Sequence, residues 1–318
     1  MQGKTGKRRI GTMGWAAITL TLLAAVLFGG WKWALANNAV ALLDWADRQF
    51  GENAGYAVAL ADGHYGPLAA QKIEVIVPAG PSERLRPVVV FIHGGGWNSG
   101  TPGDYRFIGR TLAREGYVVV LSGYRLGPEG RYPVMLEDSA LAVVWVRQHA
   151  AQYGGDLDRV FLMGHSAGAY NVMMLGLERQ WLGRVGVPDT FIKGVIGLSG
   201  PYDFYPYTSD STRAAFGQAA DGPSTQPIHF VRVDAPPLLL VTGDADVTVK
   251  ARNSEALATA MTALGRPMRP VVLAGADHSD TIMKLAAPFN RDRRVLDPVL
   301  AFLTAQCKPS APVKLPRP

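Results

Sequence analysis

The sequence contains one cysteine, Cys307, in 318 residues. A chain with one cysteine forms no internal disulfide and offers no cysteine-based zinc site. Its six histidines lack the HExxH spacing of a helical zinc site, which argues against a metalloenzyme. The 36 glycines and 22 prolines follow no period, so a collagen-like repeat is excluded. Hydrophobic residues make up 48% of the chain, enough to bury a large core, and its length suits one catalytic domain.

The chain also lacks the basic surface that its net charge of +6 would suggest. Positive side chains gather in two acid-free stretches at the ends: Lys4, Lys7, Arg8 and Arg9 near the start, and Lys308, Lys314 and Arg317 near the end. The rest of the chain is therefore nearly neutral. A nucleic-acid groove needs clustered cations, so the charge pattern predicts no nucleic-acid partner.

A run of 22 uncharged residues, 10–31, follows the N-terminal cations. About 20 apolar residues cross a bilayer as a helix, so the run predicts an uncleaved membrane anchor within residues 1–36. The alternative is a cleaved signal peptide, because Ala34-Leu35-Ala36 offers a small-x-small cleavage site. The positive-inside rule places the N-terminus in the cytoplasm and the catalytic domain on the outer side, periplasmic or extracellular. Cleavage near Ala36 would instead release a soluble exported protein.

Residues 37–70 form a connecting segment with one amphipathic piece, NNAVALLDWADRQF at 37–50. Beyond it, short β-branched runs alternate with longer amphipathic runs over residues 71–306. The expected strands are 73–77, 88–92, 118–121, 160–163, 195–198, 238–241 and 271–273, and the expected helices are 105–114, 138–153, 167–177, 253–264 and 297–306. Apolar strands that alternate with helices predict an α/β fold, in which helices cover both faces of a mostly parallel sheet. The proline-rich residues 307–318 are expected to form a disordered tail.

The motif Gly164-His165-Ser166-Ala167-Gly168 follows a strand-like run and precedes a helical one. It matches the G-x-S-x-G nucleophile elbow, whose sharp turn exposes the serine and leaves no room for a Cβ at the glycines. Ser166 is therefore the candidate nucleophile. An ordinary glycine-rich loop is the alternative, and the flanking strand and helix argue against it.

The run HGGGW at residues 93–97 follows another strand-like stretch. Consecutive glycines allow backbone N–H groups to point into a site. We expect those of Gly94 and Gly95, together with that of Ala167, to bind the oxyanion of a tetrahedral intermediate. A phosphate-binding loop is the alternative, but neither a Gly-Lys-Ser/Thr nor a GxGxxG pattern accompanies the run.

A serine nucleophile needs a base, and an acid must orient that base. His278, in the sequence GADHSD, follows a strand-like run and is the candidate base. His229, the other histidine after Ser166, precedes a strand and is expected to serve packing or a pocket. Asp246, which follows the apolar run LLLVTG, is the candidate acid, and Asp244 in the same loop is the alternative.

Together these motifs resemble the esterases and lipases of the α/β-hydrolase superfamily, near the hormone-sensitive-lipase-like and related carboxylesterase groups. The resemblance covers roughly residues 65–305 and rests on HGGGW, GYRLGPE followed by RYP, GGDLDRVFLMGHSAGAY and TGDADVTV. It implies the α/β-hydrolase fold and a triad of Ser166, Asp246 and His278. The acid region lacks the Asp-Pro pair of the hormone-sensitive-lipase-like group. It is similar instead to the GxxD turn of small esterases, feruloyl esterase-like proteins and oligopeptidase-type hydrolases.

The implied activity is that of a serine carboxylic-ester hydrolase, which acts on small to medium neutral esters through an acyl-enzyme and needs no metal or other cofactor. An amide-directed hydrolase, peptidase-like or formamidase-like, is the alternative, as is a non-catalytic membrane-tethered binding protein. Residues 201–235 contain six aromatics and are expected to form a cap-like insertion over the site. Trp97 and Tyr170 each follow a catalytic motif and are the candidate pocket walls. The sequence leaves the oligomeric state open.

Overall fold

The computed structural model describes residues 40–307. The expected membrane anchor or signal segment at 1–36 lies outside these residues, as does the expected tail after Cys307. Within residues 40–307, no helix is both long enough and apolar enough to cross a membrane. Of these residues, 43–307 belong to one compact unit.

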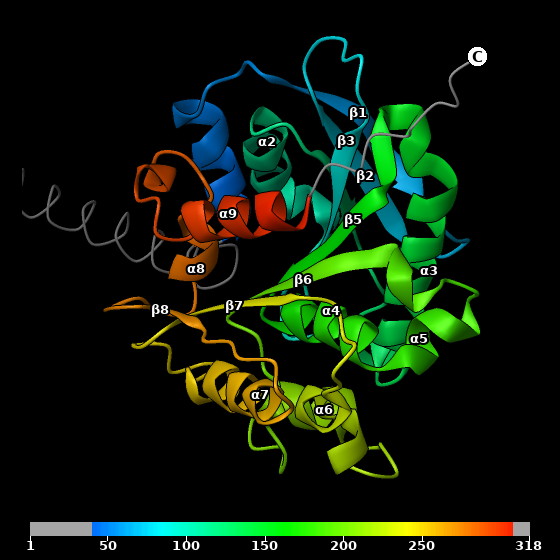
Figure 1. The fold of residues 1–318 in the computed structure, drawn as a ribbon, viewed down its shortest axis with the longest axis vertical. Helices are drawn as coiled ribbons and strands as arrows, with labels where there is room; N and C mark the ends of the chain where they lie inside the picture. The colour runs from blue at the N-terminus through cyan, green and yellow to red at the C-terminus, as the bar shows by residue number, and fades with distance from the viewer. Residues whose placement is uncertain (1–39, 308–318) are drawn as a thin grey trace, which may run out of the picture. The chain divides into compact units, whose positions relative to one another are not determined.

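Eight strands of the described residues form one sheet (Figure 1). They are β1 (Tyr56–His64), β2 (Lys72–Pro78), β3 (Arg86–Ile92), β4 (Val118–Ser122), β5 (Gly155–His165), β6 (Ile192–Leu198), β7 (Leu238–Gly243) and β8 (Val271–Leu273). Across the sheet the order is β1-β2-β4-β3-β5-β6-β7-β8. All neighbours from β4 to β8 are parallel, and β2 is antiparallel to β1 and β4. The prediction of a mostly parallel sheet is confirmed.

Helices cover both faces of this sheet, as expected (Figure 1). They are α2 (Arg106–Arg114), α3 (Val134–His149), α4 (Ala167–Leu177), α5 (Arg179–Arg184), α6 (Asp210–Phe216), α7 (Arg252–Ala263), α8 (Asp280–Met283) and α9 (Leu296–Gln306). α2 and α9 lie on one face, and α3 and α4 lie on the other. Every residue of β4 is buried. Because successive side chains of a strand point to opposite faces, such a strand needs cover on both sides.

The sheet begins earlier in the chain than the sequence analysis expected. The segment 37–70, which we expected to connect and to contain one amphipathic piece at 37–50, contains β1 and a helix at residues 40–50. β1 is an edge strand with mostly exposed side chains, so it lacks the apolar pattern that revealed the other strands. The helix at 40–50 is held by Arg110 of α2, which forms ion pairs of 2.7 Å with Asp44 and 2.6 Å with Asp47.

The insertion at 201–235 contains α6 and packs against the loop that follows β3. The Phe204 and Phe216 rings lie 6.1 Å and 4.8 Å from the Trp97 ring, between centroids. A Cβ placed on Gly96 would lie 3.4 Å from the Cβ of Ser211 in α6. The insertion therefore covers the glycine-rich loop beside the carboxyl ends of the strands, which is where parallel sheets carry their sites.

Candidate active site

Ser166 lies in the sharp turn between β5 and α4, with φ 53° and ψ −119°. A positive φ is costly for a residue with a side chain, and such strain is typical of functional positions. The turn is too tight for larger neighbours. A Cβ on Gly164 would approach the Gly168 backbone to 2.4 Å, and a Cβ on Gly168 would approach the carbonyl oxygen of Ile92 to 2.0 Å. Both glycines are therefore required for the turn that presents Ser166.

Three residues from distant parts of the chain form a continuous row of hydrogen bonds. The Oγ atom of Ser166 lies 2.9 Å from Nε2 of His278, in the loop between β8 and α8. The Nδ1 atom of His278 lies 2.8 Å from Oδ2 of Asp246, in the loop after β7. A carboxylate only accepts, so Nδ1 carries the proton and donates it to Asp246, which leaves Nε2 free to accept from the hydroxyl. The structure thus brings together the three residues that the sequence predicted.

Asp246 is held in its ionised form by its surroundings. Its side chain is nearly buried, and its Oδ1 atom accepts the backbone N–H groups of Thr248 at 2.9 Å and Val249 at 2.8 Å. Burial by itself would raise the pKa of Asp246, but the hydrogen bond and charge of His278 and the two N–H groups outweigh it, so the pKa lies below its usual value. The alternative acid, Asp244, is exposed and accepts the N–H of Gly275 at 2.7 Å. It caps a turn and does not contact His278.

The glycine-rich loop after β3 lies directly beside the nucleophile. A Cβ on Gly94 would be 3.2 Å from the Cβ of Ser166. Within the described residues, the backbone N–H groups of Gly95 and Ala167 have no hydrogen-bond acceptor, whereas the backbone of Gly94 lies within reach of the Tyr105 hydroxyl. The sequence predicted all three N–H groups as oxyanion donors, and those of Gly95 and Ala167 are free to bind an oxyanion.

His93 fixes the orientation of this loop. Its Nδ1 atom lies 2.7 Å from the carbonyl oxygen of Gly94, and since a carbonyl only accepts, Nδ1 donates. The N–H of Gly95 belongs to the same trans peptide and so points away from His93. The ring of His93 packs on Tyr124, at 4.7 Å between centroids, and burial lowers its pKa to about 4. His93 is therefore neutral at ordinary pH.

The two expected pocket walls have different roles. Trp97 lines a cavity of about 360 Å³ between the glycine-rich loop and α6, to which Arg131, Ser211 and Ala214 also contribute. Tyr170 is fully buried, donates its hydroxyl to the carbonyl of Thr225 at 2.8 Å, and packs edge-on behind Trp97. Tyr170 thus supports the wall and lies outside the lining of this cavity.

Asn171 is a buried residue that the sequence analysis missed. Its Oδ1 atom accepts the indole N–H of Trp97 at 3.2 Å, and its Nδ2 atom donates to Ser139 at 3.1 Å. Trp97 has a φ of 58°, a strained value for a large side chain, and this hydrogen bond helps to hold it. Asn171 is a lone polar residue in the otherwise apolar run AGAYNVMML, which was the signal that could have revealed it.

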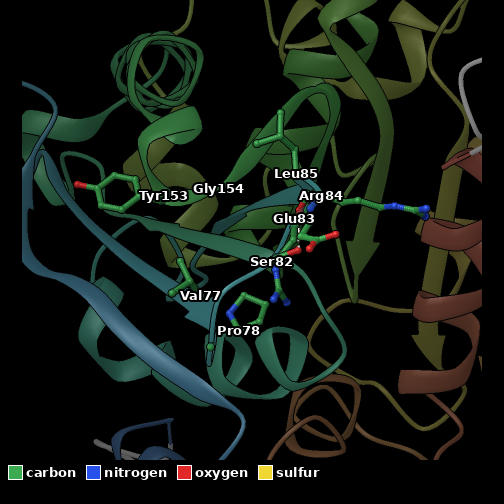
Figure 2. A pocket seen from close by; sticks show the side chains of 10 residues that line it. Val77, Pro78, Ser82, Glu83, Arg84, Leu85, Tyr153 and Gly154 are labelled. Carbon is green, nitrogen blue, oxygen red and sulfur yellow. Dashed lines mark hydrogen bonds between the residues drawn. The ribbon is translucent and has the colours of Figure 1, made fainter. Parts of the chain in front are cut away.

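A second hollow, of about 190 Å³, lies near the strand ends opposite those that carry Ser166. Figure 2 shows its lining, with Pro78 and the segment Ser82–Leu85 on one side and Tyr153 on the other. It lies at the amino end of β3, where Arg86 pairs with Gly155. Ser166 follows the carboxyl end of β5, so this hollow is separate from the candidate active site.

Comparison with known proteins identifies the family. The model of the BD-FAE family matches residues 73–261. The chain belongs to the BD-FAE family. Among solved structures, esterase B from Lactobacillus rhamnosis superimposes with a TM-score of 0.71 at 22% identity, over 91% of this chain and 97% of that one. The resemblance to α/β-hydrolase esterases is thereby confirmed, together with the α/β-hydrolase fold.

Two curated relatives differ in the reaction that their names describe. Isoprenylcysteine alpha-carbonyl methylesterase ICME of Arabidopsis thaliana is 25% identical, over 76% of this BD-FAE chain. The match spans 61% of that relative's own length, which is less than two thirds. Kynurenine formamidase of Salmo salar is 34% identical, over 49% of this chain and 50% of its own.

Proposed function

We propose that this BD-FAE protein is a serine hydrolase that cleaves small to medium, largely neutral carboxylic esters through an acyl-enzyme. The observation that carries the proposal is the row of hydrogen bonds from Ser166 through His278 to Asp246, beside the unused backbone N–H groups of Gly95 and Ala167. Nucleophile, base, orienting acid and oxyanion donors are the parts that acyl transfer requires.

The reaction follows from this geometry. Nε2 of His278 takes the proton of Ser166 as Oγ attacks the ester carbonyl, and the oxyanion that forms accepts the N–H groups of the glycine-rich loop and of Ala167. His278 then gives that proton to the departing alkoxide, which leaves an acyl group on Ser166. A water molecule then attacks the acyl group, while His278 takes one of its protons. The second tetrahedral intermediate breaks down as His278 gives this proton to Oγ of Ser166, which releases the carboxylic acid. Asp246 stays ionised throughout and stabilises the imidazolium.

An amide-directed reaction is the second candidate, since one relative is named a formamidase and the same triad would serve it. A substrate panel that contains the ester and the amide of each acyl group distinguishes the ester-directed from the amide-directed reaction. A higher kcat/KM on the esters supports the proposal, and a preference for formamides supports the alternative.

The test of the chemistry itself is labelling by a fluorophosphonate, which reacts with activated serines. We expect the probe to modify Ser166 and the Ser166→Ala variant to lose both labelling and hydrolysis of p-nitrophenyl acetate. The matched control is Ser82→Ala, at an exposed serine in the hollow of Figure 2, which should retain both. A folded wild-type protein that does not react with the probe would instead be a non-catalytic binding protein.

For location, we propose that the uncharged run at 10–31 anchors the protein, with the catalytic domain on the outer side of the membrane. We expect the protein to resist carbonate extraction, and its catalytic domain to be digested by protease added from the outer face. A soluble protein whose mature N-terminus is Asn37 would mean export without an anchor. A soluble cytoplasmic protein with an intact N-terminus would contradict both.

A further inference from the structure

His165, the residue before the nucleophile, contacts three parts of the candidate site. Its Nε2 atom lies 3.2 Å from the backbone carbonyl oxygen of His278. Its ring lies 5.0 Å from the ring of His278, between centroids. Its Nδ1 atom would lie 3.1 Å from a Cβ placed on Gly94, so this edge of the ring faces the glycine-rich loop.

The hydrogen bond defines the protonation of this ring. A carbonyl oxygen only accepts, so Nε2 of His165 carries a proton and donates it to His278. The Nδ1 atom is buried and has no hydrogen-bond partner within the described residues. Burial, followed by the charge of His278, lowers the pKa of His165 to about 3. The ring is therefore neutral and carries its one N–H proton on Nε2, the nitrogen next to the carbonyl oxygen of His278.

A neutral ring suits the chemistry proposed for this site. When His278 takes the proton of Ser166, it becomes a cation whose ring is adjacent to His165. The charged group that faces this pair before the reaction is the Asp246 carboxylate, and His278 gains a charge only when it takes the proton of Ser166. A second cation at position 165 would oppose the protonation of His278 and so raise the barrier to attack.

We propose that His165 is a positioning residue for the catalytic base: its Nε2–H group holds the backbone carbonyl of His278 and so keeps that imidazole in line with Ser166. The proposal rests on the serine-hydrolase function proposed above. A reaction that needs a hydrogen bond of 2.9 Å between Ser166 and His278 is sensitive to small displacements of the loop that carries the base. The alternative is that His165 only fills space under the loop.

The two amide residues provide the sharpest test of this role. In His165→Gln the side-chain nitrogen can occupy the place of Nε2, whereas in His165→Asn it is one bond too short and corresponds to Nδ1. Both variants are polar and neutral. We expect kcat per active site to stay within about threefold of wild type for Gln and to fall about tenfold or more for Asn, with KM nearly unchanged in both, since only the orientation of the base differs.

Active sites are counted by fluorophosphonate labelling carried to completion, so that a loss of folded protein is not mistaken for a loss of kcat. His165→Phe keeps a ring but has no donor, and should behave as the Asn variant does. His149→Gln is the control, because His149 lies on α3 and bonds only within that helix, to the carbonyl of Trp145. It should leave kcat unchanged.

The outcomes are distinct from those that test the proposed function. If Ser166→Ala retained hydrolysis, the serine-hydrolase proposal itself would fail. If Ser166→Ala is inactive, the serine mechanism stands. The positioning role of His165 would then be wrong if His165→Asn and His165→Gln lost kcat equally, or if both kept kcat within about twofold of wild type. Rescue by Gln but not by Asn, at constant KM, supports the role.

Discussion

Asp47 accepts the backbone N–H of Ala287 at 2.8 Å and thereby joins the helix at 40–50 to the segment that follows His278. The other oxygen of the same carboxylate accepts Nε of Arg110 at 2.6 Å, and both charged side chains are buried. A helix that precedes the first strand in the chain is thus tied to the segment after α8, the helix that directly follows the loop of the candidate base.

This relationship predicts a large loss of stability in Asp47→Ala. The change removes one of the two partners of a buried guanidinium and leaves the N–H of Ala287 without an acceptor. Breaking a buried pair from one side costs about 3 kcal/mol or more. Urea denaturation should therefore show a fall of that size in the free energy of unfolding.

Arg48→Ala is the control for this prediction. Arg48 forms a 2.8 Å ion pair with Asp44 on the same helix, but its side chain is 56% exposed. Because Arg48 is exposed and Asp44 keeps its second partner Arg110, the loss of Arg48 should cost at most about 1 kcal/mol. Equal losses in the two variants would contradict the importance of the buried carboxylate.

A second prediction separates the two aspartates after β7. Asp246→Asn removes the charge that orients His278 and favours the wrong tautomer, so kcat should fall by about 10³ to 10⁴. Asp244→Asn loses only the turn bond to Gly275 and should keep most of its activity, with a stability loss of about 1 kcal/mol. Kinetics with p-nitrophenyl acetate measure both. An active Asp246→Asn variant would remove Asp246 from the triad.

The candidate site was more predictable than the elements around it. Ser166 and Asp246 each follow a strand whose residues are mostly buried, so the end of each strand is visible as the end of an apolar run. His278 follows the short strand β8, which has one exposed residue but is also visible in the sequence as an apolar run. β1 gave no such signal, because an edge strand exposes most of its side chains. The helix at 40–50 lies in a stretch whose amphipathic pattern is visible, but its partner Arg110 is more than sixty positions away and no local pattern reveals that contact. α6 begins at a Ser209 cap and is too short for helical periodicity to show.

A third prediction concerns stability and pH. In the folded protein the pKa of His93 is about 4, whereas an unfolded histidine titrates near about 6.5. Between these values the unfolded state binds the proton and the folded state does not, so the free energy of unfolding decreases as the pH falls from about 6.5 to about 4. One such group contributes up to about 1.4 kcal/mol per pH unit within this window.

His93→Asn tests this prediction, because an Asn amide nitrogen can take the place of Nδ1 and keep the hydrogen bond to Gly94. Its free energy of unfolding, measured by urea at pH 7 and pH 5, should change less between the two values than that of wild type. An identical change would mean that His93 does not set this dependence. Titration of Asp246 does not interfere, since its pKa is lowered and its contribution is lost only at more acidic pH.

The last prediction concerns the oxyanion donors. Gly95 has a φ of +108°, and a Cβ there would approach the carbonyl oxygen of Ser99 to 2.0 Å. Gly95→Ala must therefore move the loop and misplace its N–H groups, and the loss of one such donor costs about 10² to 10³ in kcat. KM should change little, because the donors act on the transition state. Gly186→Ala is the matched control: its φ is +69°, no heavy atom lies within 4 Å of the added Cβ, and Gly186 lies after α5, away from the site. If the cost of an alanine at a positive φ were the whole effect, both variants would be slowed, whereas displacement of the loop that carries the oxyanion donors slows only the first.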